Sequence, residues 1–172
     1  MNQQMEKARH SLSHILALAV KKLYPGVKFG IGPAIDNGFY YDFKFPADFS
    51  VDELPNIEEK MKELLKKDIS FKRKGVSKEE ALDILSDKPF KKELIRELED
   101  KTISLYSSGE FTDLCKGPHV SSTKKIPSAG FKLDKVAGAY WKGSEENEML
   151  TRIYGLAFES ASELQKYLNQ RE

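Results

Sequence analysis

The first part of the chain has the spacing of apolar residues that is typical of an amphipathic helix. The predicted helix runs from about Gln4 to Tyr24 and ends at Pro25-Gly26. Its main apolar stripe consists of residues three or four positions apart: Leu12, Leu16, Ala19 and Leu23. At about 100° per residue, His10 and His14 fall nearly opposite this stripe. We therefore expect the two histidines to face a cleft rather than the packed core.

The next segment alternates like two strands joined by a tight turn. Two runs of β-forming residues, Phe29–Ile35 and Phe39–Phe45, flank Asp36-Asn37-Gly38. An Asn-Gly pair between such runs predicts a β-hairpin. Because successive side chains of a strand point to opposite faces, only one of Tyr40 and Tyr41 can enter a given cleft.

The middle of the chain is mainly helical in pattern. Ser50-Val-Asp-Glu53 resembles a capping box. The apolar residues that follow it have helical spacing: Leu54, Ile57, Met61, Leu64 and Leu65. Residues 69–73 alternate like an edge strand, and shorter helices are predicted from Ser77 and from Phe90 to Glu99. We expect residues 50–100, approximately, to form a mainly helical insertion.

After Thr102 the pattern changes to strands and turns. The runs with strand character are Ile103–Tyr106, Glu110–Leu114, Phe131–Leu133, Ala137–Lys142 and Met149–Phe158. Turn residues at 143–147 predict a hairpin, and Ser160 caps a final helix that reaches about Asn169. Together these elements predict an α+β fold, with an antiparallel sheet packed around the long N-terminal helix. Since no linker interrupts the chain, we expect residues 1–172 to form a single domain.

Charge is dense but balanced, with 28 basic and 27 acidic residues. This balance excludes the broad basic surface of a protein that wraps duplex nucleic acid, but allows contact with a few phosphates. The single cysteine excludes an internal disulfide and favours a reducing compartment. No apolar run approaches the roughly 18 residues of a membrane span. We expect a soluble, cytoplasmic protein that has no membrane partner.

The three histidines and the cysteine form two pairs with the same spacing. His10 and His14 make one pair, and Cys115 and His119 make the other. On a helix, the first pair would have Cβ atoms about 5–6 Å apart, which suits joint binding of one ion or substrate. Gly-Pro inside the second pair predicts a turn that can aim both side chains into one space. Asp113 would project to the same face as Cys115 in an extended segment. We expect two halves of one site.

Three kinds of chemistry fit this set. His10, His14, Cys115 and His119 could be the ligands of a tetrahedral zinc ion. The same groups could instead position a substrate and a hydrolytic water without a metal. A covalent Cys115 nucleophile needs one histidine and leaves two unexplained. Spacing does not separate the first two readings, whereas Ser11 after His10 excludes the His-Glu-x-x-His motif of zinc proteases.

Four segments together resemble the editing domain of bacterial threonyl-tRNA synthetases. They are His10-Ser-Leu-Ser-His14, residues 32–43, residues 112–120, and Gly138-Ala-Tyr-Trp-Lys-Gly143 continuing through residues 149–155. The resemblance runs in order over about residues 5–170. The first and third segments are shared with alanyl-tRNA synthetase editing domains and their free-standing relatives. The hairpin and the Gly-Ala-Tyr-Trp segment indicate the threonyl branch.

The resemblance implies an aminoacyl-tRNA hydrolase that removes serine from seryl-tRNA(Thr). A site that activates threonine cannot exclude serine by size, because one methyl-sized difference supports only about 10–200-fold discrimination. The implied partners are tRNA, whose 3′ terminal adenosine carries serine, and the rest of the synthetase chain. Two alternatives stay open: a free-standing alanyl-type trans-editing hydrolase, and a non-catalytic zinc-binding module that docks tRNA.

The resemblance also implies roles for individual residues. The residues that would line the catalytic pocket are His10, His14, Asp113, Cys115 and His119. Lys91, or Lys92 beside it, matches a lysine that approaches the terminal adenosine, and Tyr41 would be the pocket tyrosine. In the threonyl branch these residues act on bound water without a required metal, whereas the alanyl branch holds zinc at the same four positions. We favour a site without a cofactor and keep zinc as the alternative.

The sequence departs from the family at its ends. Bacterial threonyl-tRNA synthetases usually carry a small domain before the editing domain, and catalytic and anticodon-binding domains after it. This chain starts directly at the editing motifs and ends at Arg171-Glu172, in or just after a predicted helix. We expect a fragment of a longer synthetase rather than a free-standing editor. These residues offer no site for ATP or for threonine activation, so we expect no aminoacylation by this chain alone.

Overall fold

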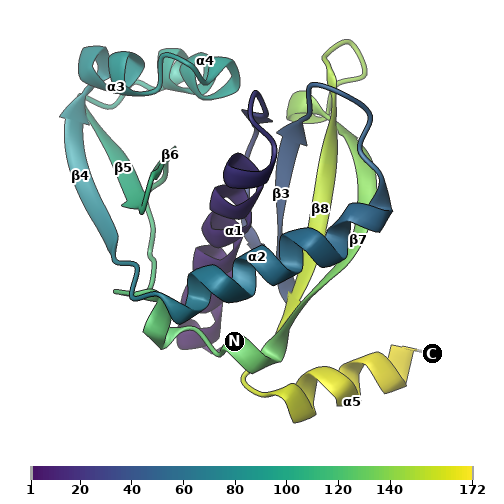
Figure 1. The fold of residues 1–172 in the computed structure, drawn as a ribbon. Coiled ribbons are helices and arrows are strands. Elements are labelled where there is room, and N and C mark those ends of the chain that lie inside the picture. Colours follow the sequence, from purple (N-terminus) through teal and green to yellow (C-terminus); the bar gives the residue numbers. More distant parts are fainter. Residues whose placement is uncertain (1, 172) are drawn as a thin grey trace.

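A long helix lies between two antiparallel sheets in the computed structural model, which describes residues 2–171 (Figure 1). Helix α1 (Gln3–Leu23) begins after Asn2, whose side-chain oxygen accepts the amide of Gln4 at 3.0 Å. It ends just before Pro25-Gly26, as the sequence predicts. The α+β class, with a long N-terminal helix and antiparallel strands, is confirmed.

The larger sheet covers one side of α1. Its strands are β1 (Lys28–Phe29), β2 (Ala34–Ile35), β3 (Gly38–Lys44), β7 (Phe131–Tyr140) and β8 (Met149–Ala157). Their order is β1-β3-β8-β7, and β2 also pairs with β3. The predicted hairpin is present: Ile35 pairs with Gly38, and Asn37 at the turn has a φ of 66°. A positive φ suits the Asn-Gly turn that joins the two strands.

Strand β7 corrects one detail of the sequence analysis, which divided this stretch into two strands. It is continuous, but its register with β8 shifts between Leu133 and Lys135. A bulge at this point places an extra residue, Asp134, on one strand. The extra residue breaks the alternation of apolar and polar side chains, and the pattern therefore looks like a gap between two strands.

The smaller sheet lies on the other side of α1 (Figure 1). It consists of β4 (Phe71–Ser77), β5 (Thr102–Ser108) and β6 (Phe111–Leu114), in the order β4-β5-β6. Helices α3 (Lys78–Ile84) and α4 (Pro89–Glu97) lie beyond one end of this sheet. Ser77 caps α3 by accepting the amide of Glu80 at 3.1 Å, as predicted.

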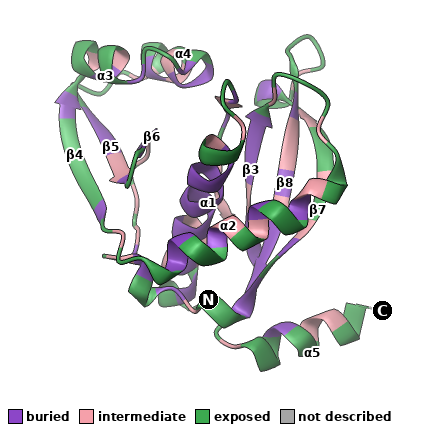
Figure 2. Cartoon of the chain, viewed as in Figure 1, coloured by how far each residue is buried: buried purple, intermediate pink, exposed green. Residues whose placement is uncertain are grey.

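Helix α2 (Leu54–Lys66) crosses α1 and buries the apolar residues that the sequence predicted for it. Ser50 does not cap α2 itself: its hydroxyl accepts the amide of Asp52 in the short 3-10 helix Val51–Glu53, which leads into α2. Further 3-10 turns occupy Thr123–Lys125, Ser128–Gly130 and Trp141–Gly143. Helix α5 (Ala161–Arg171) is mostly exposed at the C-terminal end (Figure 2).

The centre of α1 is buried on every side. All residues from Ser11 to Val20 are shielded from solvent, because sheets flank the helix and α2 crosses it (Figure 2). This arrangement takes His14 and two serines into the interior beside the leucines. Within residues 2–171, no helix has both the length and the apolar character needed to cross a bilayer.

Candidate active site

The carboxylate of Asp113, on β6, is held by side chains from three other elements. Tyr41 of β3 donates its hydroxyl to Asp113 Oδ2 at 2.8 Å. His14 Nε2 of α1 lies 3.3 Å from the same oxygen. Lys91 Nζ of α4 lies 2.8 Å from Asp113 Oδ1. Four segments that are distant in the sequence thus converge on one buried acid.

Burial alone would raise the pKa of Asp113. The ammonium of Lys91 and the hydrogen bonds from Lys91 and Tyr41 outweigh this effect and lower the pKa to about 2. Burial lowers the pKa of His14 to about 3 in spite of the carboxylate beside it, so the imidazole is neutral at pH 7. Burial, together with the charge of Asp113, raises the pKa of Tyr41 well above its usual range. The group of side chains around Asp113 therefore contains one carboxylate, one ammonium and two neutral rings.

The thiol of Cys115 lies between two histidines, one from α1 and one four residues further along its own segment. Cys115 Sγ is 3.4 Å from His10 Nε2 and 3.2 Å from His119 Nε2, and it accepts the amide of Gly117 at 3.2 Å. The rings of His14 and His119 have centroids 4.2 Å apart, which joins this group to the one around Asp113. The two pairs of the sequence analysis therefore come together.

Burial also keeps the second group uncharged. It raises the pKa of Cys115 to about 11, so the side chain is a thiol at neutral pH. Burial lowers the pKa of His119 to about 2, with a further contribution from the neighbouring His14 and His10. Burial lowers the pKa of His10 as well. A protonated thiol is a poor nucleophile.

A hollow of about 240 Å³ opens beside these residues. Its walls are formed by His10, His14, Ile31, Gly32, Pro33, Lys91, Asp113, Leu114, Cys115 and Lys116. Two of the predicted site residues lie behind this wall. Tyr41 is fully buried under Asp113, and His119 packs against the rings of Phe71 and Tyr106. These two residues contact the groups that line the hollow.

The structure separates each pair of neighbouring candidates. Lys91 is buried and contacts Asp113, whereas Lys92 is partly exposed and lies outside the hollow. Tyr41 faces the site, as the alternation along β3 requires of one tyrosine. Tyr40 lies on the opposite face, under the guanidinium of Arg152 at 3.9 Å from the ring centre.

The four residues of the two pairs also fit a zinc ion by their donor set. One ligand atom from each of His10, His14, Cys115 and His119 lies within 4.8 Å of all the others. Three imidazoles and a sulfur are ligands that zinc accepts in tetrahedral sites. His10 Nδ1 lies 3.3 Å from the carbonyl oxygen of Pro118, the kind of contact that orients metal-binding histidines. These residues could therefore hold a zinc ion.

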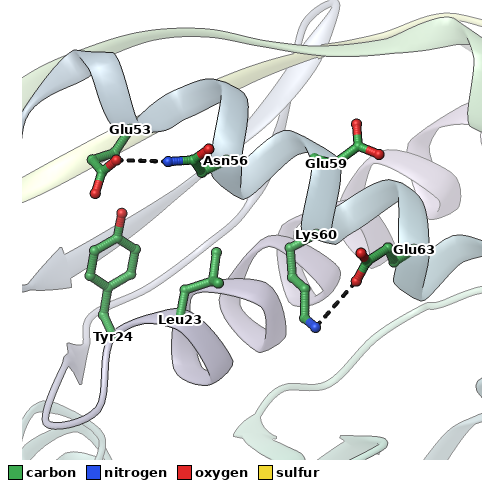
Figure 3. A pocket seen from close by; sticks show the side chains of 7 residues that line it. All are labelled: Leu23, Tyr24, Glu53, Asn56, Glu59, Lys60 and Glu63. Carbon is green, nitrogen blue, oxygen red and sulfur yellow. Dashed lines mark hydrogen bonds and ion pairs between the residues drawn. The ribbon is translucent and has the colours of Figure 1, made fainter.

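A wider groove of about 390 Å³ lies elsewhere, between the end of α1 and α2 (Figure 3). Its lining residues are Leu23, Tyr24, Glu53, Asn56, Glu59, Lys60 and Glu63. Four of their polar side chains pair with one another: Asn56 donates to Glu53 at 2.9 Å, and Lys60 to Glu63 at 3.2 Å. This groove contains neither an imidazole nor a thiol, so the smaller hollow is the better candidate for catalysis.

The sequence analysis missed two residues that contact the site. Ser11 places its hydroxyl 3.0 Å from His119 Nδ1, and Lys88 donates its ammonium to the carbonyl of Thr112 beside Asp113. Ser11 belongs to the buried part of α1, where its short side chain gave no sign of a role. The signal for Lys88 was only its closeness in sequence to Lys91.

Comparisons with known proteins agree on one group of enzymes. A family model described as the threonyl and alanyl tRNA synthetase second additional domain matches residues 103–154. Threonine–tRNA ligase of Acetivibrio thermocellus is 52% identical over 167 residues, which is 95% of this chain and 26% of that protein. Threonine–tRNA ligase of Dehalococcoides mccartyi is 48% identical over 168 residues, 98% of this chain and 28% of that protein. The chain spans about a quarter of the length of these curated relatives.

Proposed function

We propose that this chain, which is similar over nearly its whole length to one part of the threonine–tRNA ligases, hydrolyses the ester of seryl-tRNA(Thr) and spares threonyl-tRNA(Thr). The partner is the 3′ terminal adenosine that carries serine, presented by tRNA bound to the whole synthetase. The resemblance of the motifs to an editing domain supports this activity.

One observation carries the proposal: the buried carboxylate of Asp113 borders a hollow that neutral imidazoles also line. Asp113 and Lys91 both contribute to the wall, and His10 and His14 lie beside them. Ester hydrolysis needs acceptors that orient water and donors that stabilise the developing oxyanion. Both kinds of group are present around this one small space.

The chemical step is the addition of water to the ester carbonyl carbon. The bond from that carbon to the ribose oxygen breaks, the ribose oxygen takes a proton, and serine and tRNA are released. The Asp113 carboxylate accepts a hydrogen bond from water or from the ribose hydroxyl beside the ester. Lys91 has three N–H donors and gives one to Asp113, which leaves donors for the carbonyl oxygen as it gains negative charge.

His14 has the clearest vacant acceptor. A carboxylate can only accept, so the His14 nitrogen that faces Asp113 carries the ring proton, and Nδ1 keeps its lone pair. This Nδ1 is buried and has no hydrogen-bond partner among the described residues. A buried acceptor without a partner costs about 1–3 kcal/mol. We assign it to contact with the water or the substrate hydroxyl.

We propose that this reaction needs no metal. A zinc ion held by His10, His14, Cys115 and His119 would polarise the ester carbonyl or activate a bound water. Asp113 and Lys91, which are not among those four residues, supply an acceptor and donors for the same step. The alternative is a zinc-binding module that docks tRNA without catalysis. The observation that supports this alternative is the set of three imidazoles and one thiol in the cluster.

Deacylation by the purified chain tests the proposal. Seryl-tRNA(Thr) and threonyl-tRNA(Thr) are incubated separately with excess protein, so that weak docking does not hide hydrolysis. We expect release of serine and not of threonine. His14→Gln should lower the rate more than about tenfold, since positioned acid–base groups contribute about 10²–10⁴-fold. The exposed Lys124 gives the control, Lys124→Ala, which should keep full activity. Equal or absent hydrolysis of both esters would refute the proposal.

The same assay in a strong chelator separates the two alternatives for zinc. We expect less than one zinc per purified chain and hydrolysis that persists in the chelator. One tightly bound zinc per chain, with activity lost on chelation and restored by zinc, would overturn the metal-free reaction. Bound zinc without hydrolysis would instead identify a docking module.

A further inference from the structure

An unbroken series of hydrogen bonds joins the amide of Val120 to the carbonyl of Pro118 through the site. Its members, in order, are the Val120 amide, Ser11, His119, Cys115, His10 and the Pro118 carbonyl. An amide N–H can only donate, and a carbonyl oxygen can only accept. The two ends therefore fix the direction of every hydrogen bond between them, provided that both imidazoles are neutral.

The direction can be followed from the carbonyl end. His10 Nδ1 lies 3.3 Å from the Pro118 oxygen, so Nδ1 carries the ring proton. In a neutral imidazole the other nitrogen is then an acceptor. Cys115 Sγ lies 3.4 Å from this His10 Nε2, and it donates its S–H there.

The same reasoning continues through the thiol. Because its one proton is given to His10, the sulfur can only accept from His119. His119 Nε2, 3.2 Å away, is therefore the nitrogen that carries the proton, and His119 Nδ1 is an acceptor. Ser11 Oγ, 3.0 Å from Nδ1, donates its hydroxyl proton to the ring and accepts the Val120 amide at 3.0 Å. Each proton is used once, and each acceptor on the path is filled.

We propose that Ser11 is a positioning residue that fixes the tautomer of His119, with the proton on Nε2 directed at the Cys115 sulfur. This inference rests on the proposed function for its catalytic meaning. By making His119 a donor to the thiol, Ser11 turns the Cys115 S–H toward His10. It thereby decides which groups donate and which accept hydrogen bonds on that wall of the hollow. His14, which is outside the series, keeps its free Nδ1 for the reaction.

The chain offers a matched control for Ser11. Ser108 on β5 is also fully buried, but its hydroxyl has no hydrogen-bond partner among the described residues. Ser11→Ala and Ser108→Ala therefore remove the same atom from equally buried places. Only the first change removes a donor to an imidazole. Ser11→Thr keeps the hydroxyl and serves as the conservative variant.

The tautomers can be read directly by NMR of protein with ¹⁵N-labelled histidine, recorded with a chelator present and without tRNA. The chain has three histidines, so three ring systems need to be assigned. We expect opposite tautomers: His10 protonated on Nδ1, and His119 protonated on Nε2. Ser11→Ala removes the donor to His119 Nδ1, so it should add a measurable fraction of the Nδ1-protonated His119 tautomer even though Cys115 still accepts from Nε2, whereas Ser108→Ala and Ser11→Thr should keep the single tautomer. The wild-type spectrum alone overturns the inference if His119 carries its proton on Nδ1.

Kinetics provide the second measurement. Ser11→Ala should lower kcat for seryl-tRNA(Thr) by about tenfold, the value of one good hydrogen bond, and leave KM nearly unchanged. Ser11→Thr should restore most of the rate, and an unchanged rate in a Ser11→Ala protein with an altered tautomer would refute the positioning role. If wild-type protein shows the expected tautomers and no hydrolysis, the proposed function fails while the assignment of the series stands.

Discussion

The ammonium of Lys91 and the carboxylate of Asp113 lie 2.8 Å apart, and both side chains are almost completely shielded from solvent. Lys91 lies on α4 and Asp113 on β6, so a helix beyond the end of the small sheet contributes a side chain to the site. A buried ion pair adds little net stability, because its attraction mainly offsets the cost of desolvation. Removal of one partner is different, since the remaining charge stays buried without compensation.

This pair leads to a prediction of strong coupling. Lys91→Met should lower the free energy of unfolding by about 3–5 kcal/mol, because Asp113 then keeps a buried charge that directly contacts only the neutral side chains of Tyr41 and His14. Asp113→Asn in the Lys91→Met background should restore part of this loss. Urea unfolding of the wild type, both single variants and the double variant measures the coupling. Additive losses would show that the two charges do not stabilise each other.

Two buried serines should respond in opposite ways to the loss of a hydroxyl. Ser108 has no hydrogen-bond partner among the residues described, so Ser108→Ala should leave stability unchanged or raise it by up to about 1 kcal/mol. Ser13 is equally buried, and its hydroxyl is 2.7 Å from both the His10 and the Gly32 carbonyl oxygens. Ser13→Ala should cost about 1 kcal/mol or more. Thermal unfolding of the two variants provides the test, and equal shifts would contradict it.

Much of the fold was readable from local patterns. The boundaries of α1, the Asn37 turn and the Ser77 cap depend on residues that are close in sequence, and the structure confirms them. The spacing of His10, His14, Cys115 and His119 also predicted a shared location. Rare residues in two equal pairs indicate one site even when their segments are far apart in the sequence.

The remaining features depend on contacts that no local pattern encodes. The apolar stripe suggested that α1 has one buried side, but sheets on two sides and α2 across it bury the centre completely. The choice between Lys91 and Lys92 depended on the orientation of α4. The hydroxyl of Ser11 acquires its role only when residues 117–120 return to α1.

A methyl group at Gly32 should damage the site. A Cβ there would lie 2.1 Å from Cδ2 of Tyr41, whose ring is fully buried and whose hydroxyl donates to Asp113. Gly32→Ala must displace this ring, so we expect a loss of about 1–3 kcal/mol and slower seryl-tRNA hydrolysis. Gly138→Ala is the control, because its Cβ would mainly meet the flexible, half-exposed Met149 side chain. Equal stability of the two variants in urea would count against the predicted clash.

Lys88 should make stability depend on pH in a defined window. Its ammonium is buried 4.5 Å from the ring centre of Phe111, and burial lowers the pKa to about 8, although Asp113 favours the charged form. An unfolded lysine keeps its proton up to about pH 10.4. Between about pH 8 and 10.4, the unfolded chain therefore binds a proton that the native protein has released, and a rise in pH favours the native state.

The comparison with Lys88→Met isolates this effect, because the variant keeps most of the apolar stem and cannot titrate at this position. Other groups that titrate in the window, such as the tyrosines, are common to both proteins and cancel in the difference. We expect the stability of the wild type relative to the variant to rise with pH between about 8 and 10, by at most about 1.4 kcal/mol per pH unit. Below about pH 7, where lysine is charged in both states, the difference should be constant. Urea unfolding of both proteins across this range measures it. A difference that stays flat through the window would mean that the buried ammonium keeps its proton, held by Thr112 and the charge of Asp113.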